Sequence, residues 1–568
     1  MQPMNRKNTI SRTQLPLALL VALTLLLLAP AANAAAPGMT STGGTAGTFS
    51  LTAQDSYLNM PDGEAVYSWG YGCVSGSSPS YVPKATFSHA PYCNTMQVPG
   101  PTMVVTEGST VTVNLTNNLP PAAGNTSILF PGFSVTTSCT ATTPAGQQGL
   151  LTCEAAPGST VTYTFTASAP GTHPYYSGTQ GDLQIEMGLY GAVIVLPSNP
   201  PANCANGATV TNLYGKTDYG TTNNVPGFPE QDFRLGTAAY DHPRTCYDRE
   251  YLFQWAEMDA RIHKQALAQV AAMAGCTAGL PGCSLEIQTE PYHPAYFLIN
   301  GRSMPDLMDP NFASEYPHQP YNGNPHMHPG ELTLIRTIGQ GRWQHPFHEH
   351  ANHVRILARD GNLILTPTNP TTSLAGILMF NTDTTPGQAF DGIFYFSGRG
   401  LNWDQYGHHP GSSDPLATLG CTPDANGYNT GNPAALNYYE WCQDHNKPVE
   451  LAPFGDVPGG GPATLPDPDI LTNGAWYGGT PYFGPDASLR ATMPACTSNA
   501  ITGTATPNTN CTTLLPSNLQ ANPSQERGWA YMWHSHNERE ITTNNVFPGG
   551  MLMMLLVDSR EFAIDESF

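Results

Sequence analysis

The sequence predicts an all-β protein built from several β-sandwich domains in series. Its 568 residues include 56 glycines and 53 prolines, and interior proline breaks helices, so a helical bundle or coiled coil is excluded. Apolar residues make up 40% of the chain and aromatic residues 10%. This content is enough to fill large cores, so global disorder is excluded as well.

Strand-and-turn patterns predict three such domains. In the first, apolar and β-branched residues alternate over 102–119 around a turn at Glu107-Gly108. A Pro/Asn-rich linker over 197–205 follows it. The second has one credible helix over 258–275, with an aspartate near its start and a glycine at its end. The expected limits are 47–200, 206–412 and 445–568.

Residues 1–34 have the features of a secretory signal peptide. Three basic residues precede an apolar run of 13 residues over 17–29, and Ala32-Asn33-Ala34 is a small-residue cleavage site. A retained membrane anchor is the alternative, but a span needs about 20 apolar residues. We therefore expect an exported protein, in the periplasm, at the cell surface or outside the cell, with no membrane span after signal removal.

The charge balance excludes nucleic acid as a partner. The formal net charge is −21, and loss of the three basic residues of the leader makes the remaining chain more acidic still. A field of this sign repels phosphate backbones and anionic lipid surfaces. The sequence gives no indication of a protein partner.

The cysteines fit an oxidising compartment. Their number is even, they form no CxxC motif, which disfavours a zinc ribbon, and they form no CxxCH motif, which excludes covalent c-type haem. Six disulfides between neighbouring cysteines are the simplest expectation, although the sequence alone does not fix the connectivity. In sequence order the neighbouring pairs are Cys73 and Cys93, Cys139 and Cys153, Cys204 and Cys246, Cys276 and Cys283, Cys421 and Cys442, and Cys496 and Cys511.

Two short histidine strings carry the strongest functional signal. One is HPFHEH over 345–350 and the other is HSH over 534–536. In a strand, side chains at i and i+2 point to the same face, so each string presents two imidazoles together. Imidazole binds copper, zinc, iron and nickel. Surface or core histidines are the alternative for one such pair, but two pairs within apolar strands favour a metal site.

The chain resembles the multicopper oxidases in four segments. These are 97–119 (QVPGPTMVVTEGSTVTVNLTNNL), 297–305 (FLINGRSMP), 345–361 (HPFHEHANHVRILARDG) and 533–557 (WHSHNEREITTNNVFPGGMLMMLLV). The resemblance implies tandem cupredoxin-like domains, which are Greek-key β-sandwiches. It also implies copper as the cofactor, an oxidoreductase activity, and a small-molecule or metal-ion reductant with dioxygen as partners.

The departures from the family pattern predict altered copper sites. In the family, the cysteine between the last two histidines binds a mononuclear copper; here Ser535 stands in its place and offers no thiolate. The next histidine of that motif falls at Glu540. Of the mononuclear ligands only His345 is kept.

The trinuclear cluster is also reduced. Where the first domain would supply two histidine pairs, the chain has LFPG over 129–132 and YSG over 176–178. Four of the eight cluster histidines are kept, and with His345 they form the predicted metal-ligand set: His345, His348, His350, His534 and His536. No catalytic residue is assigned.

Because 184 residues separate His350 from His534, we expect one pair on the second domain and the other on the third, meeting at a domain interface. A single domain with a large insertion is the alternative. Further candidates with weaker signals are His326 and His328 as extra ligands, His353 as a core or supporting residue, and Glu349, Glu538 and Glu540 as acceptors for imidazole N–H groups.

The sequence is compatible with two functions. One is an exported copper oxidoreductase that oxidises metal ions or phenols at a reduced histidine centre, with its acidic surface favouring cations such as Mn²⁺, Fe²⁺ or Cu⁺. The other is a non-catalytic metal-binding or structural protein of the cell surface on the same scaffold. Oxygen uptake by the copper-loaded protein distinguishes them.

Overall fold

The computed structural model describes residues 36–84, 87, 89–139, 146–204, 232–327, 331–371, 373–396, 480–482, 495–496, 509–510, 528–558 and 564. Within this part of the chain nearly all regular structure is β-strand, so the predicted all-β class of sandwiches in series is confirmed. The predicted signal peptide over 1–34 lies outside the described residues. None of the described helices is long and apolar enough to cross a membrane.

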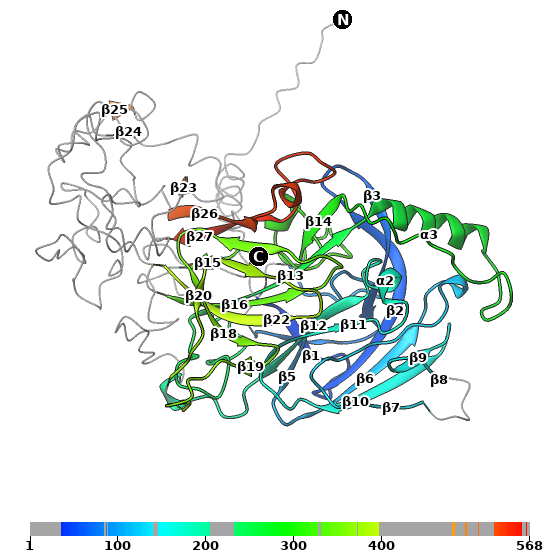
Figure 1. The fold of residues 1–568 in the computed structure, drawn as a ribbon, viewed down its shortest axis with the longest axis horizontal. Helices are drawn as coiled ribbons and strands as arrows, with labels where there is room; N and C mark the ends of the chain where they lie inside the picture. The colour runs from blue at the N-terminus through cyan, green and yellow to red at the C-terminus, as the bar shows by residue number, and fades with distance from the viewer. Residues whose placement is uncertain are drawn as a thin grey trace, which may run out of the picture.

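Two five-stranded sheets form the first sandwich, drawn in blue to cyan in Figure 1. The strands of one sheet, in spatial order, are β11 (Gly171–Tyr176), β12 (Tyr190–Leu196), β5 (Met103–Thr106), β1 (Gly38–Ser41) and β4 (Ser80–Val82). Those of the other are β3 (Ala65–Cys73), β2 (Thr48–Asn59), β6 (Thr110–Asn117), β10 (Thr160–Thr166) and β7 (Thr136–Thr137). A small ladder joins β8 (Gly146–Gln148) to β9 (Cys153–Ala155).

The alternation predicted over 102–119 becomes β5 and β6, which lie in different sheets. The turn at Gly108, with φ of +79°, carries the chain from one sheet to the other. Inward side chains of β6, including Val113 and Leu115, are fully buried between the sheets. The period-2 pattern therefore marks one face of each strand as the core face.

Two further sheets form the second sandwich, drawn in green, yellow and red (Figure 1). The strands of one are β14 (Tyr296–Ile299), β13 (Arg249–Met258), β16 (Leu332–Gly339), β22 (Ala389–Tyr395), β18 (Val354–Arg359) and β19 (Asn362–Leu363), with β20 (Leu378–Met379) on β18. Those of the other are β15 (His326–Met327), β27 (Leu552–Asp558), β26 (Gly528–Ser535), β17 (Pro346–Glu349) and β21 (Asn381–Asp383), with β23 (Thr480–Tyr482) on β26. Separately, β24 (Ala495–Cys496) pairs with β25 (Thr509–Asn510).

This second sandwich draws strands from both of the later predicted domains. Trp533 of β26 packs in one core with Phe253 of β13 and Phe347 of β17. Ring centroids of Phe347 and Trp533 are 5.9 Å apart. The ranges 249–396 and 528–558 thus both contribute side chains to one hydrophobic core.

Among the described residues the helices are short and few. The predicted helix over 258–275 is α3 (Ala260–Ala272), capped by Asp259, whose side chain accepts a hydrogen bond from the Arg261 backbone N–H. Its buried residues Ile262 and Ala266 pack on the core of the first sandwich, at the edge near β3 (Figure 1). The others are α2 (Gly181–Gln184) and the 3₁₀ turns η1 (Pro121–Ala123), η2 (Ala202–Cys204), η4 (Asp306–Met308) and η9 (Glu538–Ile541).

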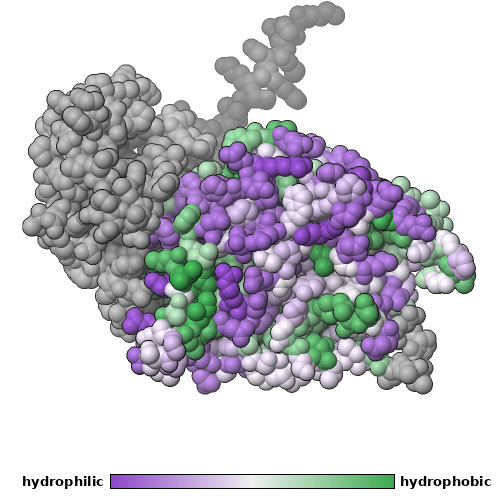
Figure 2. Space-filling view, in the orientation of Figure 1, coloured by the Kyte–Doolittle hydropathy of each residue, from purple (hydrophilic) through white to green (hydrophobic). Residues whose placement is uncertain are grey.

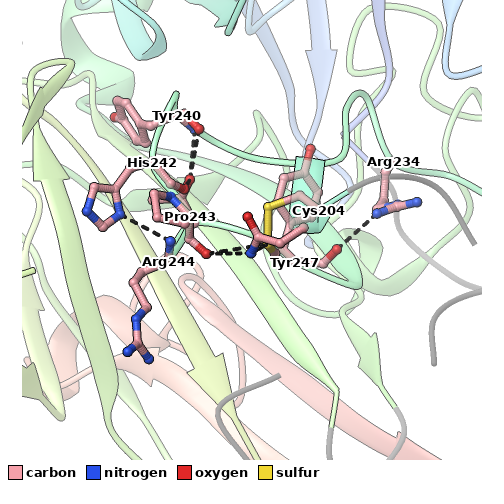
Figure 3. The surroundings of a disulfide bond; sticks show 10 residues. Cys204, Arg234, Tyr240, His242, Pro243, Arg244 and Tyr247 are labelled. Carbon is pink, nitrogen blue, oxygen red and sulfur yellow. Dashed lines mark hydrogen bonds between the residues drawn. A yellow bond between two sulfur atoms is a disulfide. The ribbon is translucent and has the colours of Figure 1, made fainter. Parts of the chain in front are cut away.

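Disulfides join neighbouring cysteines, as predicted, at every pair that the structure describes in full. The four bonds are Cys73–Cys93, Cys139–Cys153, Cys204–Cys246 and Cys276–Cys283. Cys421, Cys442 and Cys511 of the two other predicted pairs lie outside the described residues. Figure 3 shows the bond of Cys204, which ties the segment after the first sandwich to the turn before β13. Beside it, Arg234 donates to the carbonyl oxygen of Tyr247 at 3.1 Å.

The two sandwiches stack sheet against sheet, so β13 and β16 are buried along their whole length. One face of these strands lines the core of the second sandwich. The other meets the first sandwich through apolar residues that include Ile194, Leu252 and Ile338. Strands covered on both faces lose the inside-outside alternation that a half-exposed strand shows.

A buried charged network crosses this junction. Arg336 of β16 is fully buried, and its Nε lies 2.6 Å from Oε1 of Glu250. Asp391 of β22 lies 3.4 Å from the same guanidinium and accepts from the Thr172 hydroxyl of the first sandwich at 2.6 Å. Tyr240 donates to the other carboxylate oxygen at 2.5 Å. The guanidinium of Arg336 therefore supplies the positive charge for two buried carboxylates, those of Glu250 and Asp391.

We predict that Arg336→Met, which keeps volume but removes the charge, lowers the free energy of unfolding by about 3 to 5 kcal/mol, because both carboxylates lose their cation. Urea denaturation with the disulfides intact measures this change. The matched control is Lys264→Met, which breaks the exposed Lys264–Glu64 pair at 3.1 Å and changes stability by less than about 1 kcal/mol. Equal effects of the two substitutions would contradict the role of the network.

Candidate metal centre

Strands β17 and β26 bring the two histidine strings side by side. They pair antiparallel in a register that sets His348 opposite His534 and Phe347 opposite Ser535. Because faces alternate along a strand, the histidines lie on one face of the sheet. Phe347 and Ser535 are fully buried on the other. The local apolar-polar alternation and the register together create the imidazole cluster.

The two pairs therefore do not meet across a domain interface, and that expectation is wrong. Direct hydrogen bonding of β17 to β26 places both in one sheet of one sandwich. The alternative, a single sandwich with a long insertion between its strands, fits this pairing. Sequence separation misled the prediction because sheets readily join strands that are far apart along the chain.

Four imidazoles converge at this place. The ring centroids of His348 lie 4.9 Å from His350, 5.4 Å from His534 and 4.7 Å from His536. Nε2 of His350 and Nε2 of His534 are 3.3 Å apart. The ligand atoms of His348, His350 and His534 all lie within 4.8 Å of one another. Such spacing suits nitrogen atoms that share one or two metal ions.

Three of the four imidazoles, those of His348, His350 and His534, have lowered pKa values. Burial, and then the neighbouring imidazoles of His350, His534 and His536, lower the pKa of His348 from 6.5 to about 4. Burial, then His534 and His536, lowers the pKa of His350 to about 4. Burial also lowers the pKa of His534. A neutral imidazole is the form that binds metal, so the donor set fits copper.

His345 does not belong to this cluster. Its Nδ1 lies 2.8 Å from Oε2 of Glu540 and its Nε2 lies 2.8 Å from Oε2 of Glu257. The side chain is fully buried. With a carboxylate on each ring nitrogen, the predicted fifth ligand has no nitrogen left for a metal ion in this structure.

The residues at the place where the resemblance implies a mononuclear copper do not fit a copper-thiolate centre. Ser535 donates its hydroxyl to Oε2 of Glu540 at 2.5 Å. Asn537 donates its side-chain N–H to Oε1 of the same carboxylate at 2.9 Å. Soft thiolate ligation is absent at this position, and a hydroxyl and carboxylates are poor substitutes for it.

The first sandwich supplies no ligand at the two positions where the family has histidine pairs. Phe130 packs in the core, 4.9 Å from Phe165 between ring centroids. Ser177 donates to the side-chain oxygen of Gln184 at 2.6 Å. Phe130 and Ser177 are both buried in the sandwich.

The weaker candidates have other surroundings. Glu349 points away from the imidazoles and accepts from the Thr382 hydroxyl at 3.1 Å. His353 packs against Phe380, with ring centroids 5.3 Å apart. Glu538 is exposed. His326 is buried in β15, and His328 lies outside the described residues.

Glu257 is the residue that sequence reasoning missed. It lies 88 residues before His345 in a strand whose ten residues are all buried. The sequence feature that could have identified it is a carboxylate within a largely apolar strand, because a buried carboxylate needs a hydrogen-bonding or charged partner.

The carboxylates give His345 a testable pH signature. Burial alone would lower the pKa of His345, but hydrogen bonds to Glu257 and Glu540 and their charges raise it from 6.5 to about 9. A pKa raised in the folded state stabilises the protein below pH 6.5, and this stability is lost as pH rises through about 9.

We predict that His345→Gln removes this contribution. In metal-free protein, the stability difference between wild type and variant should shrink by about 3 kcal/mol from pH 6.5 to pH 9. Denaturant titrations at several pH values measure it, with His353→Gln as the control. A difference that does not change with pH would contradict protonation of His345 between the two carboxylates.

Comparisons with solved structures return multicopper oxidases at low identity. The multicopper oxidase mgLAC has a TM-score of 0.41 and 13% identity, covering 91% of this chain and 87% of that chain. A blue copper oxidase from Nitrosomonas europaea has a TM-score of 0.40 and 14% identity, covering 90% and 85%.

Sequence comparisons match the first sandwich. The family model described as multicopper oxidase matches residues 82–200. An L-ascorbate oxidase from Brassica rapa subsp. pekinensis is 40% identical over 99 residues, 17% of this chain and 16% of that protein. Laccase-3 from Botryotinia fuckeliana is 35% identical over 107 residues, 18% of this chain and 21% of that protein. The aligned segments thus span about a fifth of these relatives, and residues 82–200, most of the first sandwich, are similar to the multicopper oxidases.

Proposed function

We propose that this protein is an exported oxidoreductase that binds copper at His348, His350, His534 and His536. The observation that carries the proposal is the convergence of the ligand nitrogens of His348, His350 and His534 within 4.8 Å of one another. The similarity of residues 82–200 to multicopper oxidases supports copper as the ion, and the leader-like residues 1–34 support export. When bound, copper supplies a centre that accepts and releases single electrons.

The surroundings of the cluster support access from solvent. His348 and His350 are half-buried and His536 is exposed. Phe380 is 55% exposed and packs against His348, with ring centroids 5.8 Å apart. With Ile377 and Leu378 it contributes exposed apolar side chains beside β20, and Figure 2 shows an apolar area over this part of the molecule. A small reductant can thus approach the imidazoles directly.

The missing thiolate determines where oxidation occurs. In the family, the mononuclear copper takes electrons from the reductant and passes them to the cluster. Ser535 and the carboxylate of Glu540 support neither task here, so the reductant must give up its electrons at the imidazole cluster itself. Metal ions and phenols are the proposed reductants, with dioxygen as the acceptor. The acidic chain favours cationic reductants by long-range attraction.

We predict that wild type retains copper through desalting and that the variant His348→Ala/His534→Ala retains none, because it removes two of the three convergent ligands. Elemental analysis of the reconstituted mature protein measures this. His353→Ala is the matched control: it removes a nearby imidazole that packs on Phe380 but stands outside the convergent group. Equal copper contents in wild type and double variant would refute the site.

We predict further that copper-loaded protein consumes dioxygen with Fe²⁺, Mn²⁺ or Cu⁺ and that this rate falls as ionic strength rises, because salt screens the acidic field. Oxygen-electrode assays measure it, with a neutral phenol as the reductant whose rate stays constant. A rate of metal-ion oxidation that salt does not change would count against steering. Copper binding without any oxygen uptake would favour the non-catalytic metal-binding alternative.

A further inference from the structure

The buried side of β26 carries a second polar centre, made of Ser535, Glu540, His345 and Glu257. We infer that the carboxylate of Glu540 fills the position that a mononuclear copper takes in the family, and that this centre holds a proton on His345 in place of a metal ion. The inference does not depend on copper binding at the imidazole cluster, because the two centres lie on opposite faces of one strand.

The convergence of donors on one carboxylate oxygen is the first support. Oε2 of Glu540 lies 2.5 Å from the Ser535 hydroxyl and 2.8 Å from Nδ1 of His345. These two side chains stand at the positions where the family has the thiolate and one imidazole of the mononuclear site. Glu540 stands at the position of the other imidazole. The oxygen that meets both neighbours leaves no space between them for an ion.

The second support is the other side of the imidazole. Glu257 accepts from the His345 ring at 2.8 Å through Oε2. Its Oε1 accepts from the backbone N–H groups of Arg342 and Trp343 at 2.7 and 2.8 Å. Tyr292 lies 3.2 Å from that oxygen and donates to Glu186 of the first sandwich at 2.6 Å. Glu257 is held by four groups and cannot turn away to admit a cation.

Charge balance is the third support. The side chains that face the His345 ring are Glu257 and Trp255 from β13 and Glu540 from η9. The Thr384 hydroxyl, from the segment between β21 and β22, accepts a hydrogen bond from the backbone N–H of His345. Among these described neighbours, two carboxylates contact the imidazole ring and none of the neighbours is a cationic side chain. A protonated imidazole supplies the positive charge that two buried carboxylates require. A hydroxyl and carboxylates lack the soft ligand that copper prefers at such a centre.

The first experiment restores the family residues one at a time and uses Co²⁺, which reports thiolate ligation by a charge-transfer absorption band without oxidising the thiol. We expect Ser535→Cys alone to show no such band, because the Glu540 carboxylate still fills the centre. The double variant Ser535→Cys/Glu540→His frees the position and should gain the band and one additional bound Co²⁺ relative to wild type. Ser535→Cys/Glu538→His is the matched control, with the new histidine on an exposed neighbour in η9.

A thiolate band in Ser535→Cys alone, or in the Glu538 control, would overturn the inference, because the centre would then be open to metal with Glu540 in place. Loss of metal from the imidazole cluster in the same samples would count against the proposed function and leave this result unchanged. The two readouts are separate because only the second centre contains a thiolate.

The second experiment needs no metal and tests the proton directly. Glu540→Gln keeps the shape of the side chain and removes its charge, so His345 should lose much of its affinity for a proton. We expect the fall in stability of wild type from pH 6.5 to pH 9 to be reduced in Glu540→Gln and unchanged in Glu538→Gln. A wild-type pH profile in Glu540→Gln would overturn the inference.

Discussion

The pairing of β17 with β26 is the constraint on which both centres depend. Its register sets His348 opposite His534, and the alternation of faces then sends four imidazoles to one side of the sheet. A shift by one residue would set Phe347 or Glu349 opposite His534 and dismantle the cluster. The same register sends Phe347 and Trp533 into the shared core. Core packing therefore fixes the geometry of the candidate metal site.

The two faces of β26 balance charge in opposite ways. On the outer face, burial lowers the pKa values of His348, His350 and His534, so these imidazoles are neutral, an arrangement that a metal cation would stabilise. On the inner face, His345 already has a carboxylate at each nitrogen. The imidazole cluster has no positive charge, whereas the centre around His345 contains a protonated imidazole. This contrast explains why the proposed chemistry belongs to the outer face alone.

Much of this arrangement could be predicted from residues near one another in sequence. The HxH spacing within each string predicted correctly that each pair shares a face. The turn at Gly108 and the helix begun by Asp259 also follow from local signals. These features depend on residues within one or two turns of chain, where spacing and geometry are closely linked.

What the sequence did not predict arises from contacts between distant segments. Nothing local to His345 indicates that Glu257 meets its ring, and nothing in either string indicates that β17 and β26 are neighbours. Arg336, Asp391 and Thr172 likewise meet only because two sandwiches stack sheet against sheet. Pairing across long separations is decided by the packing of the whole fold, which periodicity does not report.

The most direct test of this account is a crystal structure of the copper-loaded protein with anomalous diffraction measured at the copper edge. We predict an anomalous peak among His348, His350 and His534 and none between His345 and Ser535. A peak between His345 and Ser535, or none among the three imidazoles, would contradict it.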